Sequence, residues 1–335
     1  MITLKDIAQA AGVSQSTVSR ILNQRPGISG PTRERVLEIA ASLNYHPNDL
    51  ARGLAGSATN IVGVIFPRIS NLYYAQLLQG IQEVAGDLGY TLVLCITNND
   101  VERALKYLQI LKGYRSAGVI YLNAYFQEKD QEGLLKADIP AIIISRKVPP
   151  GKFYSIVIDE FKEASRATRY LIELGHRRLA FIGGPLEDPW PGQLRLAGFR
   201  ETVQAYGLDL DPSLITQGDW TFGSGVAAMK RLLANGRKID AVFAASDEMA
   251  IGAMKAAQAA GLSVPGDISV IGFDGVPLGI MCTPELTTIE QPITEMGRTA
   301  MSILHRLIQK ADVENYQFVL PCRLVERASC RRRED

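Results

Sequence analysis

Residues 12–24 read GVSQSTVSRILNQ, and this stretch indicates which kind of fold the N-terminal part of the chain adopts. Ser14 is suited to cap a helix with a narrow apolar stripe, made by Val18, Ile21 and Leu22. The polar residues that must then project elsewhere are Gln15, Ser16, Ser19 and Arg20. Glutamine can bond an adenine edge, arginine a guanine edge, and serine a base or a phosphate. The pattern is typical of a helix that reads a DNA major groove, although polar residues on a surface helix are often simply solvated.

The sequence on either side predicts two more short helices. Thr3 can cap a helix that starts at Leu4, with Asp6 as a capping-box partner, and Gly12 can end it. Pro31 suits the first turn of a third helix. Its apolar residues keep helical spacing, at Val36, Ile39, Ala40 and Leu43. We therefore expect three helices around a small core.

Residues 45–60, YHPNDLARGLAGSATN, read as a linker that is only marginally helical. Pro47 ends the third helix, and Gly53 and Gly56 weaken any helix that follows. A helix of about eight residues does not hold its order alone in water. The segment is therefore not expected to be stably helical by itself.

From Ile61 onward, apolar strands alternate with helix-length segments. The predicted strands include IVGVIF (61–66), TLVLCI (91–96), GVIYL (118–122), AIIIS (141–145), SIVID (155–159), LAFIGG (179–184), AVFAAS (241–246) and ISVIGFD (268–274). A last strand is expected in YQFVLPCRLVER (316–327). Continuous apolar runs predict parallel sheets covered on both faces, so the fold class is α/β with two doubly wound units. A ligand is expected beyond the carboxyl ends of the strands, in the cleft between the units.

Composition narrows the class of protein. The 335 residues are 47% hydrophobic and 21% charged, with a net charge of +1, as in an ordinary globular protein without a global basic field. Residues 1–59 carry six basic and four acidic side chains, a modest local excess. The four cysteines form no C-x-x-C pair, so neither a metal site nor a disulfide framework is predicted. With no signal peptide and no apolar run of membrane-spanning length, we expect a cytoplasmic, nucleoid-associated protein.

The stretches TLKDIAQAAGVSQSTVSRILNQ and VLEIAASLNYHPNDLARGLAG resemble the headpiece and hinge of the LacI/GalR family of bacterial transcription regulators. The resemblance continues through both α/β units, which look like the family's periplasmic-binding-protein-like domain. It implies a headpiece over 1–46, a hinge helix over 47–59 and an effector and dimerisation domain over 60–335. Within that domain it implies an N-subdomain (about 60–160 and 290–318) and a C-subdomain (about 161–289 and 319–330).

The resemblance also assigns DNA contacts. Gln15, Ser16 and Arg20 match base-reading positions. The residues better placed for phosphates are Thr3, Ser14, Thr17, Ser19, Asn23 and Thr32. Leu54 matches a hinge leucine that enters the minor groove, flanked by Ala51 and Arg52. Packing of Leu54 within the linker is the alternative.

In the cleft, the resemblance points to residues at strand ends and in loops. These are Tyr73, Tyr74, Arg146, Asp159, Arg195, Trp220, Ser246, Asp247 and Asp274. Arg195 matches the family's effector-binding arginine, and we expect Asp274 to pair with it across a ligand. Helix capping is the alternative for Asp247. Aromatic platforms with arginine and carboxylate favour a sugar or sugar derivative, and a purine would use similar parts.

Three readings compete for the function. We expect a ligand-responsive repressor that binds double-stranded operator DNA as a homodimer, with a small-molecule effector or a protein co-regulator setting its affinity. An enzyme is disfavoured because no G-x-G-x-x-G, P-loop or G-x-S-x-G motif is present, and no cofactor is implied. A transport solute-binding protein is disfavoured by the helical headpiece and the missing signal peptide.

Overall fold

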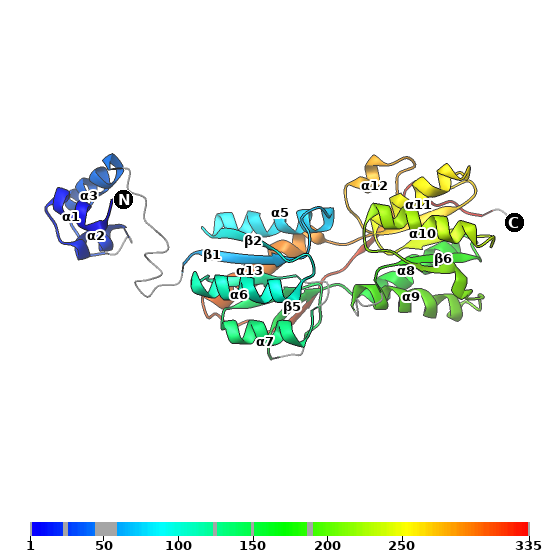
Figure 1. Cartoon of the computed structure of the whole chain (residues 1–335), viewed down its shortest axis with the longest axis horizontal. Helices are drawn as coiled ribbons and strands as arrows, with labels where there is room; N and C mark the ends of the chain where they lie inside the picture. The colour runs from blue at the N-terminus through cyan, green and yellow to red at the C-terminus, as the bar shows by residue number, and fades with distance from the viewer. Residues whose placement is uncertain are drawn as a thin grey trace. The chain divides into compact units, whose positions relative to one another are not determined.

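The computed structural model describes residues 2–22, 26–43, 59–122, 126–148, 151–185 and 190–333. The chain divides into two compact units, Met1–Thr59 and Asn60–Asp335, here called the headpiece and the C-terminal unit. Figure 1 shows the helices of the headpiece and the two α/β lobes of the C-terminal unit. The predicted hinge, with Ala51, Arg52 and Leu54, lies outside the described residues, as does Asn23.

The headpiece is helical, as predicted. It contains α1 (Leu4–Ala11), α2 (Gln15–Leu22) and α3 (Gly30–Ser42). Thr3 and Asp6 form the expected capping box of α1, and Gly12 ends that helix in a left-handed conformation with φ of 63°. Ser14 Oγ accepts from the Thr17 amide at 3.1 Å and so caps α2. The small core that joins the helices consists of Ile7, Ala8, Ala11, Val18, Ile21, Val36 and Ala40.

The first lobe of the C-terminal unit, here the N-lobe, is a six-stranded parallel sheet in the order β11-β5-β4-β3-β1-β2. Its strands are β1 (Ile61–Phe66), β2 (Thr91–Ile96), β3 (Gly118–Tyr121), β4 (Ala141–Ile144), β5 (Tyr154–Val157) and β11 (Gln317–Val319). One face is covered by α5 (Leu72–Asp87) and α13 (Ile293–Ile308), the other by α6 (Val101–Gly113) and α7 (Glu128–Ala137). The inner strands β1, β3, β4 and β5 are largely buried because both faces are covered, whereas β2, at one edge of the sheet, is partly exposed.

The second lobe, here the C-lobe, repeats this plan with the order β12-β10-β9-β8-β6-β7. Its strands are β6 (Leu179–Gly183), β7 (Ile215–Gln217), β8 (Ala241–Ala244), β9 (Ser269–Asp274), β10 (Thr287–Glu290) and β12 (Arg323–Val325). The helices α8 (Glu160–Glu173) and α9 (Pro191–Ala205) pack together, as do α10 (Phe222–Ala234) and α11 (Asp247–Ala259). A short helix, α12 (Leu278–Met281), follows β9. Phenylalanines 181, 199, 243 and 273 are fully buried in the core.

The chain passes three times between the lobes, after β5, after β10 and after β11. The single last strand expected over 316–327 is therefore wrong, because β11 and β12 belong to different sheets. Pro321 lies between them and cannot donate to a strand ladder. The β12 strand also runs antiparallel to β10, the one departure from parallel pairing among the strands described.

Close helix pairs hold each lobe together. In the N-lobe, α5 crosses α13 at Gly80, where a Cβ atom would lie 2.0 Å from the Thr294 carbonyl oxygen. In the C-lobe, α11 crosses α10 at Gly252, where a Cβ would lie 2.2 Å from the Phe222 carbonyl oxygen. Only glycine permits these backbone approaches.

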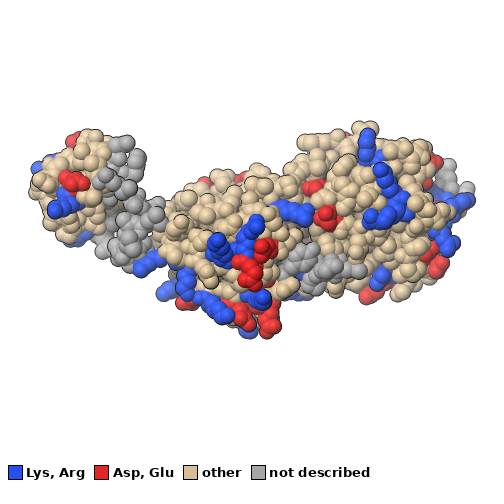
Figure 2. Space-filling view, in the orientation of Figure 1, with Lys and Arg blue, Asp and Glu red and all other residues tan. Residues whose placement is uncertain are grey.

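Opposite charges are mixed on the face of the N-lobe that carries α6 and α7 (Figure 2). Lys129 pairs with Glu102 at 3.4 Å and Lys136 with Glu132 at 3.0 Å. This face therefore presents no field of a single sign. Within the described ranges no helix is long and apolar enough to cross a membrane, and no group of ligating side chains is arranged for a metal ion.

Candidate functional site

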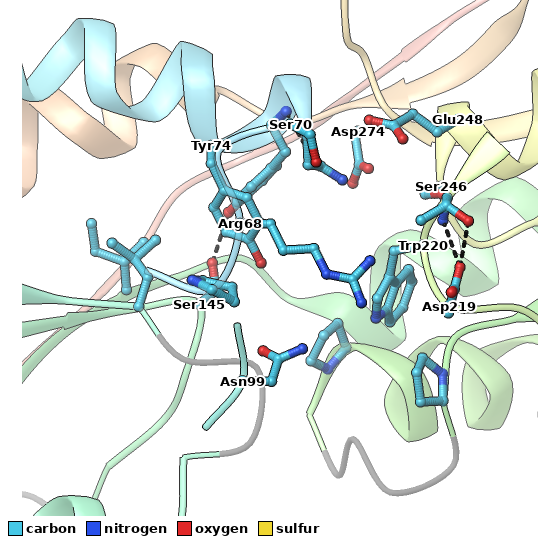
Figure 3. Close-up of a pocket in the computed structure, with 18 of the residues that line it drawn as sticks. Arg68, Ser70, Tyr74, Asn99, Ser145, Asp219, Trp220, Ser246, Glu248 and Asp274 are labelled. Carbon is cyan, nitrogen blue, oxygen red and sulfur yellow. Dashed lines mark hydrogen bonds between the residues drawn. The ribbon is translucent and has the colours of Figure 1, made fainter. Parts of the chain in front are cut away.

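A cleft between the two lobes is lined by residues that follow the strands' carboxyl ends (Figure 3). It encloses about 1080 Å³ of space not filled by protein atoms, its open mouth included. Seven of the nine predicted effector residues line it: Tyr73, Tyr74, Arg146, Arg195, Trp220, Ser246 and Asp274. The cleft is large enough for a small organic ligand with several polar groups.

Arg195 is the centre of a buried polar cluster in the cleft wall. Its Nε donates to Glu160 Oε2 at 2.7 Å, and its Nη1 donates to the Ala245 carbonyl at 2.6 Å. Nη1 also reaches Asp274 Oδ1 at 3.3 Å, so the expected pair is in direct contact. Gln291 Nε2 donates to the same Asp274 oxygen at 2.8 Å. Among the described residues, Arg195 Nη2 has no hydrogen-bond partner and remains a donor for a ligand.

Burial and neighbouring charges shift the pKa values of the ionisable groups in this cluster. Burial raises the pKa of Asp274 to about 8, against the opposing charge of Arg195. Burial opposes the charge of Arg195 as well, but Glu160 and Asp274 hold the pKa of its guanidinium above the usual value. Arg195 also stacks on Phe273, with 3.7 Å from Cζ to the ring centroid. The guanidinium is thereby fixed in one position.

Aromatic side chains approach the cleft from both lobes. The Tyr73 hydroxyl is 2.7 Å from Ser145 Oγ, and burial raises the pKa of that hydroxyl well above its usual value. Tyr73 and Tyr74 meet edge to face, with ring centroids 5.4 Å apart. On the C-lobe, the Trp220 indole lies against the backbone of Gly184. These rings offer apolar faces beside polar groups, as ligands with ring hydroxyls or bases require.

Backbone strain is concentrated in the cleft. Four of its lining residues have left-handed φ angles: Asn99 at 62°, Ser145 at 61°, Trp220 at 70° and Asp274 at 119°. Such conformations are uncommon for residues other than glycine and persist where the surrounding structure holds them in place. Here they turn side chains into the space between the lobes.

Two predicted effector residues lie outside the cleft lining. Asp159 caps α8, accepting from the Lys162 amide at 3.1 Å. Asp247 is fully buried, and its Oδ2 accepts from the amides of Gly275 and Val276 at 2.8 Å each. Its Oδ1 accepts from the Thr288 hydroxyl at 2.5 Å. Asp247 therefore holds the loop after β9 in place and does not face the cleft.

Replacing Asp247 by alanine is expected to destabilise the C-terminal unit by about 2 kcal/mol, because buried donors at Gly275, Val276 and Thr288 lose their acceptor. Asp247→Asn is the matched control, since an amide oxygen can still accept from the loop and its amide can donate to Thr288. Urea denaturation of both variants measures the difference. Equal losses for the two variants would show that these hydrogen bonds do not carry the effect.

Other lining residues were not predicted from the sequence. Among them are six polar or charged residues, Arg68, Asn99, Ser145, Glu160, Asp219 and Glu248. Five follow strand ends: Arg68 comes two residues after β1, Asn99 three after β2 and Ser145 directly after β4, with Asp219 and Glu248 after β7 and β8. The rule that places ligands at carboxyl ends of parallel strands could have found them. Glu160 is the first residue of α8, where the chain first passes between the lobes.

The headpiece presents the predicted DNA-reading residues at its surface. Gln15, Ser16 and Arg20 are exposed, while Val18 and Ile21 of the same helix are buried. Arg20 Nη2 donates to the Pro26 carbonyl at 2.9 Å. One face of α2 is therefore polar and accessible.

The residues predicted for phosphate contacts lie near helix starts. The hydroxyls of Thr3, Ser14 and Thr32 each hydrogen-bond within the first turn of a helix or with its cap. Thr17 and Ser19 are half-buried on α2. Helix N-termini attract anions, which suits this placement.

These features define a class of protein: a helix-turn-helix headpiece followed by a two-lobed ligand-binding unit. Residues 3–48 match the family model of bacterial regulatory proteins of the lacI family. Residues 168–330 match a periplasmic binding protein-like domain.

Similar proteins span almost the whole chain. The catabolite control protein A of Priestia megaterium is 36% identical over 328 residues, which cover 98% of this chain and 99% of the relative. The ribose operon repressor of Escherichia coli K12 is 35% identical, covering 98% and 100%. The crystal structure of the lac repressor dimer bound to operator and an anti-inducer superposes with a TM-score of 0.88 at 32% identity, covering 98% and 99%.

The chain therefore belongs to the lacI family of bacterial regulatory proteins. It is a DNA-binding transcriptional regulator and not an enzyme.

Proposed function

We propose that the chain is a homodimeric repressor of a near-palindromic operator, released or recruited by a small effector bound between its lobes. Gln15, Ser16 and Arg20 read bases, and Leu54 of the hinge wedges into the minor groove at the operator centre. The effector is a sugar or sugar derivative. The observation that carries this proposal is the Arg195 cluster in the cleft, which offers free donor and acceptor atoms beside aromatic faces.

The same cluster supports a switch. Glu160 begins α8 after the first passage between the lobes, and Gln291 lies in the second passage. Both side chains bond to the Arg195–Asp274 pair. A ligand that engages Arg195 therefore acts on groups attached to two of the connecting segments. A change in lobe orientation would alter the spacing of the two hinges in a dimer, and with it the affinity for DNA.

Exposed apolar residues support the homodimer. On α12 the exposed fractions are 36% for Leu278, 55% for Ile280 and 72% for Met281. Three apolar side chains on one four-residue helix are costly to leave in water, and a second copy of the chain would cover them. A two-fold dimer also matches the symmetry of a palindromic operator.

The test begins with selection of binding sites from random duplex DNA by the full-length protein. A near-palindrome is expected, and its affinity is then measured by fluorescence anisotropy with D-ribose, D-glucose, cellobiose and adenine. At least one sugar should change the operator affinity about tenfold, within the usual range of allosteric coupling. A response to adenine alone would favour a purine effector, and no response at all would favour a protein co-regulator.

A matched pair of variants links the response to the cleft. Trp220→Ala should bind the selected operator normally without sugar and lose the response to it, because the aromatic platform is gone. Tyr206→Ala removes an aromatic side chain that is exposed at the end of α9, and should keep the response. A chain that selects no DNA sequence would overturn the proposal as a whole.

A further inference from the structure

The charges of the described residues that line the cleft leave no cation in excess. Three arginines line it, Arg68, Arg146 and Arg195, against four carboxyl groups, Glu160, Asp219, Glu248 and Asp274. Because the pKa of Asp274 is raised to about 8, three carboxylates face the three arginines near neutral pH, and Asp274 adds a further negative charge only above that pH.

Two of the arginines face protein carboxylates. Arg195 is bonded to Glu160 at 2.7 Å and contacts Asp274 at 3.3 Å. The Arg68 guanidinium lies beside Trp220 (Figure 3), within electrostatic reach of Asp219 and Glu248. An anionic group brought to either arginine would come close to these carboxylates.

The helix end that could hold an anion is already engaged. The N-terminus of α5 opens on the cleft, and helix N-termini are natural sites for phosphate or carboxylate groups. Here Glu248 Oε1, from the opposite lobe, accepts from the Leu72 amide at 3.4 Å. Asn71 Oδ1 accepts from the next amide, that of Tyr73, at 2.8 Å. An anionic ligand would have to displace a carboxylate of the protein.

The cleft atoms that lack a hydrogen-bond partner among the described residues include acceptors, which a ligand would satisfy with donor groups. Asn99 Oδ1 is buried, lines the cleft and has no hydrogen-bond partner among the described residues. Glu160 Oε1 and Glu248 Oε2 accept no hydrogen bond from any described residue, whereas the other oxygen of each carboxylate does. Hydroxyl groups can donate to all of these atoms, whereas a phosphate is an acceptor only at its ionised oxygens.

We propose that the cleft selects polyhydroxylated effectors without an anionic group, and that Glu160, Asp219 and Glu248 are the residues that reject phosphorylated or carboxylated ones. This inference deepens the proposed function and rests on it. A sugar is accepted and its phosphate ester is refused, although both carry the same ring. Asp274 adds to the rejection only above about pH 8, because burial raises its pKa.

The charge of the cleft can be measured without knowing the ligand. The chain has two tryptophans, and Trp190→Phe leaves Trp220 as the only one. Quenching of its fluorescence by caesium, iodide and neutral acrylamide is compared at low, constant ionic strength. One unit charge about 6 Å away changes the local concentration of a monovalent ion about threefold in water. Arg195 Cζ lies 5.7 Å from the centroid of the Trp220 ring, and Arg68 lies beside that ring, so the informative quantity is the change in the caesium-to-iodide ratio of quenching constants when neighbouring carboxylates are neutralised.

Neutralising variants assign the effect to the named residues. Asp219→Asn and Glu248→Gln together, in the Trp190→Phe background, keep an acceptor oxygen at each position and remove two negative charges. The quenching ratio should fall about two- to threefold relative to the single variant. Glu173→Gln, on the exposed end of α8, is the matched control and should leave the ratio unchanged. A ratio that is the same with and without the charges of Asp219 and Glu248 would overturn the proposal.

A second experiment compares the binding of neutral sugars with that of their anionic derivatives. Thermal shift and calorimetry compare D-ribose with ribose 5-phosphate, and D-glucose with glucose 6-phosphate and gluconate. The neutral member of a pair that binds should bind at least about tenfold more tightly, and the double variant should narrow that gap. Tighter binding of a phosphate or acid would contradict the proposal. If none of these ligands binds, the quenching ratio still tests the charge selectivity of the cleft. Failure of the protein to bind an operator would contradict the proposed function and would leave the charge selectivity of the cleft to be decided by the quenching experiment.

Discussion

Substitution of Arg195 by alanine is expected to lower the free energy of unfolding of the C-terminal unit by about 3–5 kcal/mol near neutral pH. The side chain of Arg195 is buried together with its carboxylate partners Glu160 and Asp274. Removing the cation leaves two carboxylates in an apolar wall without their counter-ion. Arg195→Ala is therefore first a stability variant, and a loss of effector response in it would not by itself identify an effector contact.

The loss should depend on pH. A carboxyl whose folded-state pKa lies above its unfolded value of 3.8 stabilises the folded state less as the pH rises towards the raised value. Arg195 opposes that rise for Asp274, so its removal makes the effect larger. Below the raised pKa of about 8, Asp274 is protonated in both folded proteins. The difference between wild type and variant, from urea denaturation, should therefore change little between pH 4 and pH 7 and grow above pH 8.

Two further variants test this account of Arg195. Arg200→Ala removes an exposed arginine from the same helix and should change stability by less than about 0.5 kcal/mol. Adding Glu160→Gln and Asp274→Asn to Arg195→Ala should recover part of the loss, because the uncompensated charges are removed. A loss that is independent of pH and is not recovered would point to packing against Phe273 instead.

Substitution of Gly80 by alanine is expected to cost about 3 kcal/mol. The new methyl group would lie 2.0 Å from the Thr294 carbonyl oxygen and 3.0 Å from the Arg298 amide nitrogen, both backbone atoms of α13. Backbone atoms cannot change rotamer, so α5 and α13 must move apart and open the buried face of the N-lobe. The change should appear as a lower denaturation midpoint.

Gly86 provides a control on the same helix. Its nearest neighbour to an added Cβ is the end of the Gln82 side chain, at 3.8 Å. Alanine there meets no obstacle and has the better helix propensity, so Gly86→Ala should be neutral or stabilising by up to about 1 kcal/mol. A similar loss at both positions would mean that helix crossing is not the cause.

Much of the fold follows from patterns that are visible in the sequence. Continuous apolar runs located the buried parallel strands, and capping residues located the starts of α1 and α2. Two strands were not predicted, because β7 reads ITQ and β10 reads TTIE, and neither is a continuous apolar run. Thr287 and Thr288 are fully buried in β10, but their hydroxyls bond to the Arg327 amide and to Asp247. Hydropathy does not reveal a polar residue that is satisfied by a distant partner.

The cleft was predicted in position and only partly in composition. A polar residue after a strand can face the cleft, as Ser145 does, or turn back to cap a helix, as Asp159 does. The sequence does not distinguish these outcomes, because they depend on the conformation of one or two loop residues. Arg195 is hydrogen-bonded to both Glu160 and Asp274, which lie 35 and 79 positions away from it in the sequence. Only the folded chain brings these three residues together.

The three passages between the lobes determine the order in which the protein can be completed during synthesis. Neither lobe is a continuous piece of chain, since the N-lobe needs α13 and β11 and the C-lobe needs β12. A growing chain folds from its N-terminus as it leaves the ribosome. The helices of the headpiece, all within residues 4–42, can form early, whereas neither sheet can gain its last strand until nearly the whole chain has been translated. The part of the molecule that recognises DNA is thus ready before the part that regulates it.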